Sequence, residues 1–202
     1  MITLYGIEWS RANYVLFTLE ELGIEYKHVK THPFEEGKNS PEYLALNPMA
    51  QVPTLVDGDL VLTESMAINF YLARKYGADK LWFDRLEDEA QIFKWTFFAV
   101  AQMEAHSVDI IFQKKIVEEK DRDFGVIKRA ERALMKPLSV LDSYLDDKDF
   151  LVGNKFCVAD INVAGILSYA RNGEYDFSSY KNVSRYLDNI LSRPARKRAE
   201  AT

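Results

Sequence analysis

The chain has 202 residues, of which 48% are hydrophobic and 28% are charged, as is typical of a globular protein with a sizeable core. Its formal net charge of −5 argues against nucleic acid or an anionic membrane as the main partner. The single cysteine, Cys157, excludes an internal disulfide and a cysteine-based metal site. No uncharged apolar run approaches the ~18 residues of a membrane span, and the N-terminus has no signal-peptide features. We therefore expect a cytoplasmic protein without a bound metal.

Residues 1–78 are predicted to form an α/β domain. Strand, helix and strand patterns within the first 30 residues indicate a βαβ unit with parallel strands, and its helix should end at Gly23. An Asp57-Gly58 turn between apolar runs predicts a hairpin. We expect strands at 2–5 and 24–30, a short helix at 41–46, hairpin strands at 53–56 and 60–62, and a helix at 64–77.

Long helical patterns begin after a linker at 78–84, so residues 85–202 are predicted to form an all-helical domain. The fold class is therefore an α/β domain followed by an all-α domain. We expect the helices of the second domain at 87–119, 121–145, 158–170 and 183–192. A cluster of positive charge near the C-terminus should be a solvated helix end or tail; it comprises Arg193, Arg196, Lys197 and Arg198.

The loop after the first strand places Ser10 at the start of a helix. A hydroxyl group there lies beside free backbone N–H groups and the positive end of the helix dipole. It could therefore donate a hydrogen bond to the thiolate of a ligand. The alternative is that Ser10 only caps the helix, and the segment by itself favours capping.

Two later segments also have two interpretations each. Pro53 directly precedes a strand, and a cis Val52–Pro53 bond would leave the Val52 backbone free to bind an extended peptide. A plain turn is the alternative. Glu64 and Ser65 open the next helix, where a carboxylate, a hydroxyl and free N–H groups match the ammonium and carboxylate groups of an α-amino acid. An N-cap with an acidic first turn is the alternative, and spacing by itself favours it.

Blocks of sequence in a fixed order carry more information than each segment alone. They are LYG at 4–6 with Ser10-Arg11, LEELGIEY at 19–26, PEYLALNP at 41–48, QVPTL at 51–55, LTESMAI at 62–68, FCVADI at 156–161 and SRPA at 192–195. With these blocks the sequence resembles the cytosolic glutathione transferases, of the serine type and similar to the bacterial theta and beta classes. The resemblance covers essentially the whole chain.

The resemblance implies a thioredoxin-like N-terminal domain that binds glutathione as co-substrate, an all-helical C-terminal domain and a homodimer. By motif position, the Val52 backbone would pair with the cysteinyl part of glutathione, with Pro53 cis. Glu64 and Ser65 would bind the γ-glutamyl amino and carboxylate groups. Lys38 would reach the glycyl carboxylate, from a loop that departs from the family pattern. The full set of implied glutathione-binding residues is Gln51, Val52, Pro53, Glu64, Ser65 and Lys38.

The same resemblance assigns the catalytic groups. Some relatives have a cysteine at the helix-capping position, whereas here the residue is Ser10 and none of residues 10–13 is a cysteine. Thiolate activation is therefore favoured over thiol exchange. A hydrogen bond of about 1–3 kcal/mol to sulfur would lower the thiol pKa by about one or two units. Arg11 would add electrostatic help, and Tyr5 is a secondary candidate because some classes use a tyrosine near the first strand.

Cys157 stands where the family pattern has serine or threonine, three residues before Asp160. This spacing is that of a capping box, so we interpret Cys157 as structural and not catalytic. Family position also suggests a pocket between the domains for the second substrate. Its candidate residues are Ile7, Trp9, Phe98, Met103 and His106, although aromatic residues and methionine at helical spacing are more often core residues, and a core or surface position is favoured for His106.

The function predicted from the resemblance is that of a detoxifying glutathione S-transferase acting on small hydrophobic electrophiles. Glutathione-dependent peroxidase, isomerase and dehalogenase reactions are alternatives because they use the same activated thiolate. A non-catalytic interaction protein of the same fold is a further alternative. The joint presence of Ser10, Val52-Pro53 and Glu64-Ser65 argues against it.

Overall fold

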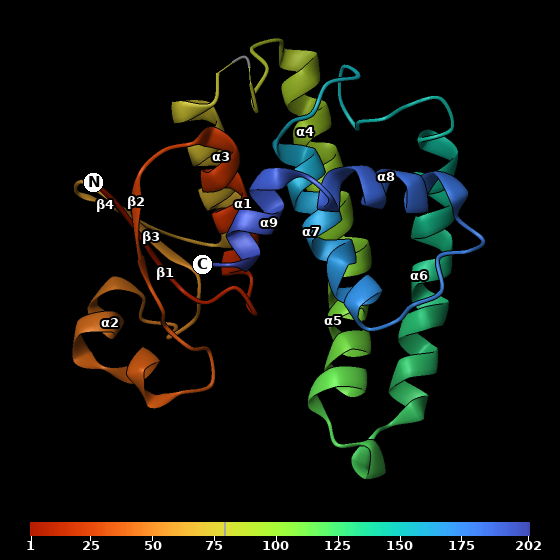
Figure 1. Ribbon diagram of the computed structural model, residues 1–202, viewed down its shortest axis with the longest axis horizontal. Helices are drawn as coiled ribbons and strands as arrows, with labels where there is room; N and C mark the ends of the chain where they lie inside the picture. The colour runs from red at the N-terminus through yellow and green to blue at the C-terminus, as the bar shows by residue number, and fades with distance from the viewer. Residues whose placement is uncertain (79) are drawn as a thin grey trace. The chain divides into compact units, whose positions relative to one another are not determined.

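The computed structural model describes residues 1–78 and 80–202, which form two compact units (Figure 1). The first unit contains Met1–Phe83 and Arg193–Thr202, and the second contains Asp84–Ser192. The structure thus groups the last ten residues with the first unit, whereas the sequence prediction counted them with the helical domain. No helix among the described residues is long and apolar enough to cross a membrane.

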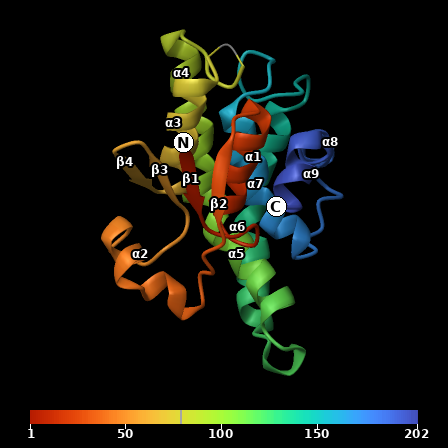
Figure 2. The same cartoon turned by 60° about the vertical axis from the view of Figure 1, so that its left-hand side comes forward.

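The first unit is built on a four-stranded sheet in the order β2–β1–β3–β4, which can be followed in Figure 2. The strands are β1 (Ile2–Tyr5), β2 (Tyr26–Val29), β3 (Thr54–Asp57) and β4 (Leu60–Thr63). β1 pairs with β2 in parallel and with β3 in antiparallel orientation, and β3 and β4 form the hairpin. The predicted βαβ unit and hairpin are confirmed, and the sheet is that of a thioredoxin-like domain.

Three helices of this unit lie close to the predicted positions: α1 (Ala12–Leu22), α2 (Pro41–Leu46) and α3 (Ser65–Tyr76). α1 ends where expected because Gly23 adopts a left-handed φ of 68° and its N–H donates to the Leu19 carbonyl at 3.0 Å. α3 is tied to the end of β3 through Asp57. One carboxylate oxygen of Asp57 accepts hydrogen bonds from Tyr71, Lys75 and Tyr76 at 2.7, 2.8 and 2.6 Å.

A further helix, α9 (Pro194–Glu200), packs against α1. The expectation of a solvated helix end or tail is confirmed for the exposed Lys197 but was wrong for Arg193 and Arg198, which pair with acids on α1, and for the buried Arg196, which pairs with Glu200 on α9. Arg193 binds Glu21 through two hydrogen bonds of 2.5 and 3.0 Å, and Arg198 binds Glu20 at 2.6 Å. Arg196 is only 4% exposed. The end of the chain is therefore held to the first unit by paired charges.

The second unit is entirely helical, as predicted. Its helices are α4 (Leu86–Ala99), α5 (Ala105–Ile111), α6 (Phe124–Tyr144), α7 (Val158–Asn172) and α8 (Lys181–Leu191). π-helical turns at Val100–Glu104 and Phe112–Ile116 interrupt the long helix that the sequence predicts at 87–119. α7 is almost completely buried and packs against α4, α5 and α8, so it forms the centre of this unit.

The start of α7 carries the predicted capping box. The Asp160 carboxylate accepts hydrogen bonds from the backbone N–H groups of Cys157 and Leu151, both at 2.9 Å, and from the Tyr186 hydroxyl at 3.1 Å. Burial raises the pKa of Asp160 to about 6 and raises the pKa of the Cys157 thiol well above its usual value. A buried thiol with a raised pKa is unreactive, which agrees with a structural role for Cys157.

Candidate functional site

Three loops of the first unit meet at one edge of its sheet. Tyr5, the last residue of β1, lies opposite Thr54, the first residue of β3, and Thr54 lies opposite Thr63, the last residue of β4. The segments that follow β1, precede β3 and follow β4 therefore share that edge. They are the segments that carry Ser10, Val52-Pro53 and Glu64-Ser65.

Gly6 lies at the centre of this edge and has a φ of 142°, which favours glycine. A Cβ atom on Gly6 would lie 2.5 Å from the Ala12 Cβ atom, so no larger residue fits. The same point lies 3.5 Å from the Val52 Cβ atom and 3.7 Å from the Ser10 hydroxyl oxygen. The structure thus brings Ser10 and Val52 together around one glycine.

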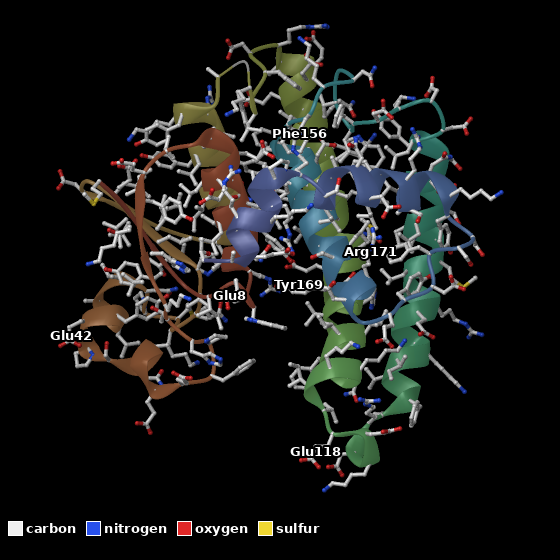
Figure 3. The ribbon with its side chains drawn as sticks, in the orientation of Figure 1. Glu8, Glu42, Glu118, Phe156, Tyr169 and Arg171 are labelled. Carbon is white, nitrogen blue, oxygen red and sulfur yellow. The ribbon has the colours of Figure 1, made fainter. Side chains whose placement is uncertain are left out.

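The Ser10 hydroxyl is engaged in two hydrogen bonds at the start of α1. It accepts from the Ala12 N–H at 3.1 Å and donates to the Ile7 carbonyl at 2.7 Å. Ser10 itself is 8% exposed. The loop before it is braced by Asn13, whose side chain donates to the carbonyl of Glu8 at 3.0 Å. Figure 3 labels Glu8 in this loop. The capping interpretation of Ser10 is confirmed, and the proton of its hydroxyl is shared with a single carbonyl.

The Val52–Pro53 peptide bond is cis, as predicted. The backbone N–H and C=O of Val52 make no hydrogen bond to any other described residue, because β3 begins only at Thr54. The carbonyl of the preceding residue, Gln51, is held by the Tyr43 hydroxyl at 2.6 Å and by the Asn47 amide at 2.8 Å. The cis bend is therefore held through the Gln51 carbonyl, whereas the Val52 N–H and C=O groups are free to pair with a ligand.

The start of α3 carries the two residues that the sequence predicts for an anion site. Glu64 has a φ of 66°, a conformation that is costly for a residue with a side chain, and its carboxylate is exposed. Ser65 is 5% exposed and is the first residue of the helix. Neither side chain forms a hydrogen bond within the described part of the chain, and Glu64 occupies the N-cap position of α3 without a side-chain capping bond. Both groups and the first N–H groups of α3 thus stay available to a ligand.

The remaining candidates of the first unit differ in exposure. Tyr5 is half-buried, with its ring 5.7 Å from that of Tyr43, whereas Arg11 is exposed at the start of α1. Trp9 is 80% exposed. Lys38 lies half-buried in the 3-10 turn Glu36–Asn39, and no hydrogen bond or ion pair joins it to another described residue.

Both halves of the chain match known families. Residues 1–74 match the family described as "Glutathione S-transferase, N-terminal domain", and residues 92–194 match "Glutathione S-transferase, C-terminal domain". This chain belongs to the glutathione S-transferase family. The resemblance inferred from the sequence blocks is therefore confirmed, and the chain is a glutathione transferase.

Relatives of this transferase extend over nearly the whole chain. Probable glutathione S-transferase GSTF1 of Oryza sativa subsp. japonica is 32% identical over 93% of this chain and 89% of its own length. Glutathione S-transferase GstB of Escherichia coli (strain K12) is 30% identical over 96% of this chain and 95% of its own length. The theta class glutathione S-transferase of the citrus canker pathogen Xanthomonas axonopodis pv. citri, solved with glutathione bound, has a TM-score of 0.92 at 27% identity and covers 100% of this chain and 97% of its own.

The candidate second-substrate residues of this transferase are divided between the two units. Ile7 is buried and belongs to the first unit, as does Trp9. In the second unit, Phe98 is half-buried and lies edge-on to a tryptophan, Met103 is 1% exposed within the first π-helical turn, and His106 is half-buried on α5. A common pocket for these residues stays a prediction.

Sequence reasoning missed the residues that hold the backbone of the candidate site in place by hydrogen bonds to its carbonyl groups. Tyr43 and Asn47 hold the Gln51 carbonyl, and both also contact the Thr54 hydroxyl, at 2.9 and 3.2 Å. The His28 ring lies 2.8 Å from the Gly6 carbonyl and donates to it through Nε2. Tyr43 and Asn47 fall within the PEYLALNP block, so their position in a family motif was the available signal. Nothing local marked His28, which reaches Gly6 only through the parallel β1–β2 pair.

Proposed function

We propose that this glutathione transferase binds glutathione along the edge formed by Gly6, Val52 and the start of α3, and that Ser10 stabilises its thiolate. The observation that carries the proposal is the unpaired Val52 backbone close to the Ser10 hydroxyl, on either side of Gly6. An extended peptide can pair with such a backbone as an added strand, which places its side chain beside the hydroxyl. For glutathione that side chain is the cysteinyl thiol.

The two ends of the tripeptide find complementary charges. Ser65 and the N-terminal N–H groups of α3 suit the γ-glutamyl carboxylate, and the Glu64 carboxylate suits the γ-glutamyl ammonium group. Gln51 lies next to Val52 and is exposed, so its side chain can add a polar contact. Lys38 is the proposed partner of the glycyl carboxylate. The solved theta class relative with glutathione bound supports this choice of ligand.

Activation requires the Ser10 proton to turn from the Ile7 carbonyl to the sulfur. A thiolate is charged and therefore a stronger acceptor than a carbonyl, so its hydrogen bond is the stronger one. The positive end of α1 and the exposed guanidinium of Arg11 favour the same charge. Together these contacts lower the thiol pKa by about one or two units. Tyr5 is the second choice, because its ring packs against Tyr43.

Ultraviolet absorbance of the thiolate, followed against pH with glutathione bound, tests the proposal. We expect Ser10→Ala to return the bound thiol pKa toward that of free glutathione and to slow conjugation at neutral pH by about 10- to 100-fold. Ser10→Thr keeps the hydroxyl and should retain most of the shift. Ser40→Ala is the matched control because Ser40 caps α2 in the same unit, accepting from a backbone N–H at 3.2 Å. A wild-type pKa shift that survives in Ser10→Ala would exclude Ser10.

Binding of the γ-glutamyl end is tested separately. Glu64→Gln should raise the Michaelis constant for glutathione with little change in the bound thiol pKa, because the carboxylate contacts the ammonium group and not the sulfur. Glu42→Gln is the control, since Glu42 is an exposed acid in the first turn of α2 (Figure 3). Equal effects of the two substitutions would show that the change is one of overall charge.

The second substrate is proposed to be a small hydrophobic electrophile. Trp9, the neighbour of Ser10, exposes 80% of its surface and offers an aromatic face near the proposed thiolate. A panel of aromatic and aliphatic electrophiles, together with hydroperoxides, decides between conjugation and peroxidase chemistry. Trp9→Ala should raise the Michaelis constant for aromatic electrophiles more than for aliphatic ones. Equal changes for both kinds would remove Trp9 from the pocket.

The assembly is proposed to be a homodimer in the cytoplasm. On α4, Leu86 and Phe97 are 76% and 58% exposed, and Phe93 stacks on Phe97 at 6.3 Å, so this face carries apolar surface that a second copy could cover. Reduced glutathione is maintained in the cytosol, which fits the proposed location. Light scattering after size-exclusion chromatography should give twice the chain mass, and Phe97→Glu should halve it. A monomeric wild-type protein would overturn the proposal.

A further inference from the structure

The Gln51 carbonyl is held by a buried group of polar side chains beside the proposed glutathione edge. It accepts hydrogen bonds from the Tyr43 hydroxyl at 2.6 Å and from the Asn47 amide at 2.8 Å. Both donors also contact the Thr54 hydroxyl, at 2.9 and 3.2 Å. The side chains of Tyr43, Asn47 and Thr54 are all buried, and together we call them the Gln51 clamp.

The contacts of the Gln51 clamp determine which group donates to which. Asn47 Oδ1 accepts from the Met49 N–H at 3.1 Å, so Asn47 Nδ2 is the atom that donates to Gln51 and Thr54. The Thr54 hydroxyl is then free to donate to the Tyr43 oxygen, and the Tyr43 proton goes to the Gln51 carbonyl, which can only accept. Burial raises the pKa of Tyr43, so this proton is retained. The chain of donors therefore ends on one carbonyl oxygen.

The clamped carbonyl belongs to the same peptide unit as the Val52 N–H. The Gln51–Val52 bond is trans, since the cis bond of this segment is the next one, Val52–Pro53. In a trans peptide the C=O and N–H groups point in opposite directions. Because the Gln51 carbonyl faces Tyr43 and Asn47, the Val52 N–H faces away from them. The Gln51 clamp thus determines where this unpaired donor points, without touching it.

We propose that the Tyr43 hydroxyl, as part of the Gln51 clamp, positions the Val52 N–H for the cysteinyl carbonyl of glutathione. The inference rests on the proposed function, in which glutathione pairs with the Val52 backbone. Tyr43 is a positioning residue because it contacts neither the tripeptide nor its thiol and acts through the Gln51–Val52 peptide. A donor that is held in place before the ligand arrives lowers the cost of binding. The Gln51 clamp therefore governs the affinity for glutathione, whereas Ser10 governs the acidity of the bound thiol.

The variant that tests the proposal is Tyr43→Phe. It keeps the ring, which lies 5.7 Å from the Tyr5 ring, and removes only the hydroxyl. The matched control is Tyr26→Phe, which removes a hydroxyl that bonds to a carboxylate on α1 at 2.9 Å. Tyr26 lies opposite Ile2, at the other end of the β1–β2 pair from the glutathione edge. The two substitutions therefore make the same chemical change, one beside the proposed site and one away from it.

Two thiols separate positioning from general damage to the site. Glutathione has the cysteinyl carbonyl, whereas γ-glutamylcysteamine lacks both that carbonyl and the glycine, so it cannot accept from the Val52 N–H. In titrations of the full chain followed by NMR, we expect Tyr43→Phe to raise the dissociation constant of glutathione about five-fold. The dissociation constant of γ-glutamylcysteamine, and kcat at saturating glutathione, should change less than about two-fold. Glutathione should also slow hydrogen exchange of the Val52 amide more in the wild type than in Tyr43→Phe, and Tyr26→Phe should behave as the wild type.

Thr54→Val is a second variant, which keeps the testing possible if Tyr43→Phe does not fold. It removes the hydroxyl that orients Tyr43, so it should also weaken glutathione more than γ-glutamylcysteamine. Equal weakening of both thiols, or an effect of Tyr26→Phe as large as that of Tyr43→Phe, would overturn the proposal.

The Ser10→Ala measurement keeps this inference apart from the proposed function. If Ser10→Ala abolishes the shift of the bound thiol pKa while Tyr43→Phe matches its control, only the role of the Gln51 clamp is wrong. If glutathione leaves the Val52 amide of the wild type unprotected, the proposed glutathione edge and the role of the clamp are both wrong.

Discussion

The Asp160 carboxylate, a hydrogen-bond acceptor at the centre of the second unit, offers a direct test of what stabilises that unit. Asp160 is fully buried and receives three hydrogen bonds, from the backbone of Leu151 and Cys157 and from the Tyr186 hydroxyl. Asp160→Ala leaves these three donors without an acceptor in the protein interior. The two backbone donors belong to the segment before α7, so the helix loses both its cap and its attachment to that segment.

The size of the effect follows from two opposing contributions. An unsatisfied buried donor costs about 1–3 kcal/mol, and three donors are affected. Removal of the buried Asp160 charge offsets part of this loss of stability. Burial raises the pKa of Asp160 from 3.8 to about 6, a shift that corresponds to about 3 kcal/mol against the ionised form at neutral pH. We therefore expect a net loss of about 3 kcal/mol in the free energy of unfolding, or about 10 °C in Tm for a chain of this length.

Differential scanning calorimetry at neutral pH measures this loss, and Asp188→Ala is the matched control. Asp188 lies on α8, is 60% exposed and pairs with Arg171, so its removal should cost less than about 1 kcal/mol. The pH dependence is a second readout. Because the folded-state pKa of Asp160 lies above the unfolded value, wild-type stability falls as pH rises from about 4 to about 6 and is level above. The reasoning would be refuted if Asp160→Ala had the same Tm as Asp188→Ala, or if its stability fell between about pH 4 and pH 6 as that of the wild type does.

Three further predictions concern other parts of the chain. Cys157→Ser should raise Tm, with a gain of up to about 1 kcal/mol in the free energy of unfolding, because a hydroxyl caps a helix better than a thiol. It should leave turnover unchanged, and a large loss of activity would contradict this prediction. The Lys75 hydrogen bond holds the pKa of Asp57 at about 2, so the stabilisation is present above about pH 4 and is lost as pH falls through 4 to 2. Asp57→Asn should thus cost about 1–2 kcal/mol in urea unfolding at pH 7 and little at pH 2.5; a constant cost excludes the charge. Glu21→Ala should lower Tm and speed proteolysis near Arg193, because α9 loses its ion pair with α1. Glu25 is an exposed acid beyond the end of α1, so Glu25→Ala should change neither quantity.

The features that the sequence predicted well are those recorded in neighbouring residues. Gly23 ends α1 because the turn needs a left-handed residue at that point, and Gly58, with a φ of 61°, allows the hairpin turn between Asp57 and Leu60 for a similar reason. Pro53 needed only its place before a strand to suggest the cis bond. Each of these is a backbone requirement satisfied by one residue type, so it can be read without knowing the fold.

The features that it missed depend on residues far apart in the chain. Arg193 binds Glu21 although 172 positions separate them, and no local pattern tells a paired arginine from a solvated one. The π-helical turn at Val100–Glu104 is missed because one extra residue per turn hardly alters the apolar spacing of a long helix. His28 contacts Gly6 only because β1 and β2 are adjacent and parallel.

The two interpretations of Ser10 use different parts of one hydroxyl group. The lone pair accepts the Ala12 N–H and caps α1, whereas the proton is given to the Ile7 carbonyl. If the hydroxyl turned its hydrogen bond from the Ile7 carbonyl to a bound thiolate, keeping its proton, the cap would stay in place, so capping and the proposed catalysis do not compete. The cap even fixes the oxygen beside Gly6, where the thiolate is expected. Ser10→Ala should therefore lose about 1 kcal/mol of stability as well as the thiol pKa shift, whereas Ser40→Ala should lose only stability.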